Sequence, residues 1–134
     1  MPARMKNEPY DIKRIEKQMH LEDIIQKLDL KVLTEPVDFS TIPVNSGYCS
    51  DLLSCVMTGA APEGLWITLM AHGNIVAVAA LLDLSAIIIT EDAQPDTDTI
   101  NRANEKGVTM LSTSASNFTV IGQLWELGLR AAQA

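Results

Sequence analysis

The chain has 134 residues, a hydrophobic fraction of 47% and a formal net charge of −7. This length favours one domain with a sizeable core, and the hydrophobic fraction excludes a disordered protein. The charge is uneven: residues 1–18 carry five Lys and Arg against three Asp and Glu, whereas residues 19–134 carry five against fourteen. Because duplex binding needs clustered cations, so acidic a body leads us to expect no nucleic acid partner.

The sequence also argues against a membrane or secreted protein. Asn74 and Asp83 interrupt the longest apolar run, so it is too short to span a bilayer. The N-terminus is charged and lacks a hydrophobic signal region, so we expect a cytoplasmic protein with free thiols at its two cysteines. Residues 1–18 are assigned to an N-terminal extension, disordered or helical, and residues 19–134 to a single α/β domain.

Short helices and strands are predicted to alternate in the first half of the domain. A helix is expected over Leu21–Leu28, because its apolar residues recur at spacings of three and four. A second helix is expected over Asp51–Thr58, with Ser50 as its cap. The strand candidates in this half are Leu30–Leu33 and Ile42–Asn45.

The centre of the sequence reads as strand, turn, apolar helix and strand. The strands are Leu65–Met70 and Ala86–Thr90, with the helix Ile75–Leu82 between them. Neither strand alternates polar with apolar residues, so both are expected to be buried on two faces in a parallel βαβ unit. The helix has no polar residue, so it is either enclosed in the domain or contacts a second subunit, and we expect a homodimer.

Two further helices and a strand complete the predicted fold. Thr97 or Asp98 is expected to cap the polar helix, which runs through Lys106. The strand is Val108–Leu111, and the last helix opens at Ser116 or Asn117. Five strands and about five helices in alternation predict an α/β layered domain with a mostly parallel sheet. The last helix is expected to face the core with Phe118, Ile121, Leu124, Trp125 and Leu129.

Sheets of this kind bind ligands beyond the carboxyl ends of their strands, where a turn at residues 72–74 is expected. The start of the following helix suits an anion, because it offers free N–H groups and a partial positive charge. Gly73 would let the anion approach the backbone, and His72 would add charge or a hydrogen bond. The alternative is structural: Gly73 only makes the turn and Asn74 only caps the helix.

Two other polar segments are candidates for the same edge. Ser112, Thr113 and Ser114 offer hydroxyls that either bind a phosphate or ribose or serve as ordinary caps. The segment Ser46, Gly47, Tyr48 precedes the second helix, and Tyr48 either stacks on a base or covers the core. Cys49, next in sequence, is either a thiol of lowered pKa or an inert buried one.

No catalytic or metal motif is readable. The chain lacks a GxxxxGK[ST] phosphate loop, its Cys and His residues lack zinc-site spacing, and no serine has a recognisable base. We therefore expect no enzyme, no cofactor and no metal.

The segments GYCSDLLS, at residues 47–54, and HGNIVAVA, at residues 72–79, resemble the DRTGG domain family. The likeness covers about Leu21 to Leu129 and is greatest to small stand-alone members found beside iron hydrogenase genes in anaerobes. It implies a fold similar to the N-terminal domain of HPr kinase/phosphorylase and a regulatory or dimerising role. The Thr-Gly-Gly part of the family motif falls at Thr90–Asp92, which adds Thr90 to the candidate site. The family's arginine and two glycines are absent here.

Two functions from different classes follow. The first is a non-catalytic regulatory domain that binds a nucleotide or another phosphate-containing metabolite and acts through a dimer or a partner. The alternative is a protein interaction module without a small-molecule ligand, which the resemblance would link to hydrogenase assembly or regulation.

Overall fold

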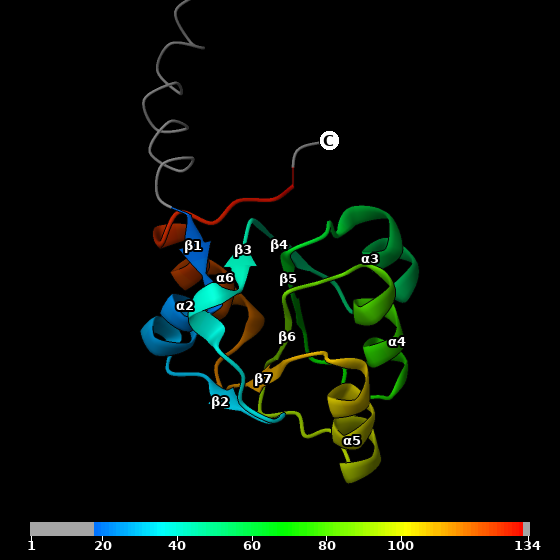
Figure 1. The fold of residues 1–134 in the computed structure, drawn as a ribbon. Coiled ribbons are helices and arrows are strands. Elements are labelled where there is room, and N and C mark those ends of the chain that lie inside the picture. Colours follow the sequence, from blue (N-terminus) through cyan, green and yellow to red (C-terminus); the bar gives the residue numbers. More distant parts are fainter. Residues whose placement is uncertain (1–17, 133–134) are drawn as a thin grey trace, which may run out of the picture.

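Five strands form the central sheet in the part of the chain that the computed structural model describes, residues 18–132 (Figure 1). The strand order is β2-β7-β6-β5-β4, in which β4 to β7 are parallel and β2 is antiparallel to β7. The predicted fold class, a layered α/β domain with a mostly parallel sheet, is confirmed. The strands are β2 Lys31–Val32, β4 Ser46–Cys49, β5 Gly64–Thr68, β6 Ala86–Ile89 and β7 Met110–Ser112.

Helices cover both faces of this sheet (Figure 1). Leu65 and Ile67 of β5 belong to the core on one face, and Trp66 belongs to the core on the other. Because both faces are buried, the strands need apolar residues at every position, which explains the missing alternation in the sequence. The first face carries α2 Leu21–Leu28 and α6 Asn117–Glu126; the second carries α3 Leu53–Gly59, α4 Asn74–Leu81 and α5 Thr97–Lys106.

A small second sheet lies outside the main one. It pairs β1, Met19–His20, with β3, Pro43–Val44, and the 3₁₀ helix η1, Phe39–Thr41, precedes β3. Nearly all of the predicted extension, residues 1–18, falls outside the described residues, so its boundary with the domain stays a prediction.

Several predicted elements agree closely with the structure. The helix Leu21–Leu28 has the predicted bounds, and its C-terminal neighbour Asp29 adopts a left-handed conformation with φ 53°. The central βαβ unit is present with bounds shifted by one or two residues. Gly107 ends α5 with φ 71°, a conformation that favours glycine.

The prediction for residues 42–49 is only partly correct. The predicted strand Ile42–Asn45 contains β3, but β3 belongs to the small sheet, and the edge strand of the main sheet is β4, at residues where no strand was predicted. Gly47 lies in β4, where a glycine suits the short space: a β-carbon would come within 3.1 Å of Leu129 Cδ2. Tertiary packing has overridden local propensity.

The second and last helices also differ from prediction. The second begins at Leu53 instead of Asp51, and Ser50 accepts a hydrogen bond from the Leu52 amide at 3.0 Å, ahead of the helix. On α6, Val120 and Leu124 are buried, whereas three residues of the predicted core stripe are exposed. These are Phe118 at 89%, Trp125 at 57% and Ile121 at 40% exposure.

Candidate functional site

The carboxyl ends of β4 and β5 are joined by a carboxylate. Asp51 Oδ1 accepts hydrogen bonds from the Thr68 hydroxyl at 2.7 Å and from the Leu69 amide at 3.0 Å. The Thr68 hydroxyl in turn accepts one from the Met70 amide at 3.1 Å. The loops that follow β4 and β5 are therefore held together by hydrogen bonds within the protein.

The predicted site residue Thr90 also makes an internal bond. It is fully buried at the end of β6, and its hydroxyl donates to Asn117 Oδ1. Glu91 follows with φ 59°, and its Oε2 accepts a hydrogen bond from the Asn117 amide at 3.1 Å. The protein's own carboxylate thus occupies the start of α6, where an external anion would otherwise bind.

The hydroxyl turn after β7 lies beside this carboxylate. Ser112 is buried within β7, and the Thr113 hydroxyl accepts a hydrogen bond from the Ala115 amide at 3.1 Å. Ser114 is exposed, and Ser116 caps α6 by accepting from the Thr119 amide at 3.2 Å. Ser116 is thus a helix cap, and Thr113 makes a local bond within the turn, so the structure favours a structural role for both hydroxyls.

The start of α4 has a different environment. Gly73 is its N-cap residue with helical dihedrals, φ −59° and ψ −27°, and no described side chain caps the helix, so the predicted Asn74 cap is wrong. A β-carbon on Gly73 would come within 2.5 Å of Arg102 Nη1. Glycine at this position therefore makes room for the guanidinium, which places a cation against the helix start.

His72 and Arg102 share an acidic neighbour in Asp96. Asp96 accepts a hydrogen bond from the Thr99 amide at 2.8 Å as the cap of α5. Hydrogen bonds from Thr99 lower the pKa of Asp96, and the nearby Arg102 and His72 lower it further. His72, Asn74 and Arg102 are all exposed, so this cluster is open to solvent.

One predicted part of the site does not lie at the carboxyl edge of the sheet. It consists of Ser46, Gly47 and Tyr48, which were expected to follow a strand. They lie within β4, with Ser46 buried at its amino end, where it pairs with Gly64 of β5. The Tyr48 ring fills the space beside Gly59 of α3, because a β-carbon there would collide with the ring. Tyr48 covers the core.

Cys49 follows these residues at the carboxyl end of β4 and is exposed, whereas Cys55 is half-buried; both are free. Partial burial of the thiol raises the pKa of Cys49, and the Asp51 carboxylate raises it further. The alternative of an activated, low-pKa thiol is therefore not supported.

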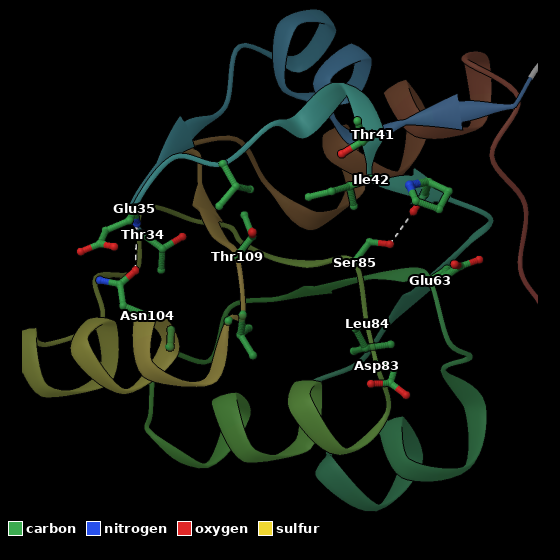
Figure 2. A pocket seen from close by; sticks show the side chains of 15 residues that line it. Thr34, Glu35, Thr41, Ile42, Glu63, Asp83, Leu84, Ser85, Asn104 and Thr109 are labelled. Atoms are coloured by element: carbon green, nitrogen blue, oxygen red, sulfur yellow. Dashed lines mark hydrogen bonds between the residues drawn. The ribbon is translucent and has the colours of Figure 1, made fainter.

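A cavity of about 440 Å³ lies at the opposite, amino edge of the sheet (Figure 2). Glu63, Ser85 and Thr109 line it and directly precede β5, β6 and the start of β7. The segment from Thr34 to Pro43 forms the other wall. The sequence did not predict this cavity. Ligand sites in parallel sheets are expected at the carboxyl ends of the strands, and the lining of this cavity comes from four separate segments that share no motif.

Within residues 18–132, no three His, Cys, Asp or Glu side chains gather in a way that could hold a metal ion. In the same part of the chain, every helix is too short or too polar to cross a membrane.

Comparison with known proteins places these features in a family. The model of the DRTGG domain matches residues 55–127. The crystal structure of the CBS and DRTGG domains of the regulatory region of Clostridium perfringens pyrophosphatase, complexed with its activator diadenosine tetraphosphate, is similar, with a TM-score of 0.64 and 17% identity. The match covers 78% of this chain and 45% of that one, so this chain spans less than half of the pyrophosphatase region. No curated protein matches the sequence.

Proposed function

The chain belongs to the DRTGG domain family, and from that premise we propose that it is a non-catalytic regulatory domain that senses a small anionic ligand. A nucleotide is the favoured class, because the similar regulatory region of pyrophosphatase is complexed with the activator diadenosine tetraphosphate. The bound state is passed on through a homodimer or a partner protein in the cytoplasm.

One observation carries the choice of site: the Arg102 guanidinium lies against Gly73 at the start of α4. A helix start carries a partial positive charge, and an adjacent arginine adds a full charge with several donors in a planar fork. His72 is exposed beside them and supplies another donor. Together these groups suit a phosphate.

The remaining predicted site residues support the site only indirectly. Thr90 fixes the neighbouring loop, and Glu91 fills the start of α6. Ser114 is the exposed hydroxyl of the turn after β7. A phosphate is therefore directed to α4, because the starts of α5 and α6 at this edge already have acidic partners in Asp96 and Glu91.

Asp96 competes with the ligand for Arg102 and His72, since both lie near its carboxylate. The substitution of Asp96 by Asn removes the charge but keeps the oxygen that caps α5, so it should free these two side chains for a phosphate. The Asp96→Asn variant is therefore expected to bind nucleotides more tightly than the native protein, which is opposite to the expected effect at Arg102.

The test is calorimetric titration with adenine, guanine and uridine nucleotides, with and without Mg²⁺. A nucleotide that binds the native protein should bind the Arg102→Ala variant at least about tenfold more weakly, a loss of about 1.4 kcal/mol. Lys106→Ala removes another cation of α5, from its last turn, and serves as the matched control. Equal loss in both variants would indicate a general charge effect and contradict the site.

A second function is favoured by the outer face of α6. Phe118, Ile121 and Trp125 are spaced at three and four residues and are exposed among residues 18–132, so they form an apolar stripe, although the Arg130 guanidinium lies over the Trp125 ring at 3.5 Å from its centroid. The stripe suits a protein interaction module, and a protein of hydrogenase assembly or regulation is the partner that the resemblance suggests. Binding of such a protein that is lost in Phe118→Ser, without nucleotide binding by the native chain, would favour this function.

The homodimer has its own candidate surface on α4. Its inner side is buried through Ile75, Val76 and Ala79, while Leu81 is 67% exposed. An exposed leucine on a helix without charged residues suits a symmetric contact. Sedimentation velocity should find a dimer for the native protein and a monomer for Leu81→Glu; an unchanged sedimentation coefficient would remove α4 from the interface.

A further inference from the structure

The cavity at the amino edge contains a buried hydroxyl without a partner. Thr109 is 8% exposed and lines the cavity, and its hydroxyl has no hydrogen-bond partner among residues 18–132. Figure 2 shows this side chain directed toward the segment that carries Thr41 and Ile42. A buried hydroxyl without a partner is costly, so its direction into an open volume indicates that something else satisfies it.

A second buried hydroxyl beside it is only partly used. Thr34 is 7% exposed, and its oxygen accepts a hydrogen bond from the Met110 amide at 3.1 Å. A hydroxyl that accepts one bond still has a proton to donate and a second lone pair. Thr34 and Thr109 therefore present polar atoms to the interior of the cavity.

Carboxylates lie at two opposite ends of the same cavity (Figure 2). Glu35 lies at one end beside Asn104, whose Oδ1 accepts from the Glu35 amide at 2.8 Å. Glu63 and Asp83 lie at the other end, where the Glu63 amide donates to the Asp83 carbonyl at 2.9 Å. All three side chains are exposed, so a cation held by them stays partly solvated.

Part of the cavity lining is apolar, and the charged side chains of the lining disfavour an anion. Val37, Ile42 and Val108 lie among the lining residues, which, in the described part of the chain, include three carboxylates and no Lys, Arg or His. The only charged side chains that a phosphate would meet among these lining residues are carboxylates, whereas ammonium groups would find carboxylate acceptors at both ends, with Glu63 Oε1 shared with the Asn45 side-chain amide at 2.6 Å. The volume of about 440 Å³ lies in the range of small-molecule sites.

We propose that this cavity binds a linear aliphatic diamine or polyamine, with an ammonium group at each acidic end, the methylene chain against the apolar lining residues, and an inner N–H or water on the Thr109 hydroxyl. The site differs in position and in charge preference from the nucleotide site at Arg102. The two proposals can be contradicted independently, because nucleotides test the site at Arg102 and amines test this cavity.

The experiment is calorimetric titration of the full chain with putrescine and with spermidine. We expect a dissociation constant below about 1 mM for at least one of them. The variants Glu35→Gln and Asp83→Asn should each weaken binding about tenfold, because each removes one charged acceptor. Butylamine, which has one ammonium group, should bind more weakly than putrescine.

An acidic protein also attracts polyamines without any specific site, so a charge-matched control is needed. Glu22→Gln and Glu126→Gln remove exposed carboxylates of α2 and α6 that do not line the cavity, and binding should be unchanged in both. Equal weakening in control and cavity variants would overturn the proposal, as would absence of heat with both amines up to about 10 mM.

Discussion

The Arg102 guanidinium lies over the backbone of Gly73, so close that a β-carbon on residue 73 would come within 2.5 Å of Nη1. The contact joins the start of α4 to α5 across the carboxyl edge of the sheet. It accounts for glycine at a position whose φ of −59° does not require one. The residue is small because a cation is held beside it.

Gly73→Ala should therefore separate binding from stability. The atom that meets the new methyl group is the far end of a flexible side chain, so Arg102 moves and the fold is kept. Because the dihedrals are helical, the free energy of unfolding should change by less than about 1 kcal/mol, while nucleotide affinity falls about tenfold. Urea unfolding and calorimetry measure the two quantities. Unchanged affinity would show that the position of Arg102 does not matter.

Gly59→Ala should destabilise the fold through Tyr48, whose ring lies where the methyl group would go. Overpacking of this kind costs about 1–3 kcal/mol. The cost should shrink when Tyr48→Ala is added, because the two residues are in contact, and a double-mutant cycle in urea measures the coupling. Additive costs would mean that Tyr48 does not pack against α3.

Thr109→Val should stabilise the free protein. Valine keeps the shape of the side chain and removes a hydroxyl that is buried without a partner, so the free energy of unfolding should rise by about 1 kcal/mol. Urea unfolding without added amine measures it, and Thr41→Val is a control at an exposed lining residue whose hydroxyl donates to the Asp38 carbonyl at 2.9 Å. A loss of stability in Thr109→Val would show that the hydroxyl has a structural partner.

Cys49 should react slowly with alkylating agents. Partial burial and the Asp51 carboxylate raise the pKa of this thiol, so less reactive thiolate is present near neutral pH than for a free cysteine. In a Cys55→Ser background, iodoacetamide should modify Cys49 faster after Asp51→Asn, because the neighbouring charge is gone. A rate unaffected by Asp51→Asn would contradict the electrostatic part of this account.

Much of the fold follows from local patterns. The spacing of apolar residues gives the helix Leu21–Leu28, and the two unalternating apolar runs give β5 and β6. The resemblance to the DRTGG domain is confirmed, although the matched range begins at Cys55 and leaves out the GYCSDLLS segment. Likeness to the HPr kinase/phosphorylase N-terminal domain stays a prediction.

The errors arise where long-range packing decides the outcome. Gly47 lies in β4, where Leu129 leaves little room for a side chain, and Phe118 is exposed because Val120 and Leu124 fill the interface of α6. No local signal carries either fact. Arg102 was missed as a site residue for the same reason, since 29 positions separate it from Gly73.

The central claim is a nucleotide site at Arg102, and thermal unfolding against a nucleotide panel tests it most directly. A ligand at a hundred times its dissociation constant stabilises by about 2.7 kcal/mol, which for a domain of this size raises the midpoint by roughly 5–15 °C. The account predicts such a shift for at least one nucleotide with the native protein and little or none with Arg102→Ala. A flat panel, or an equal shift in the variant, would contradict it.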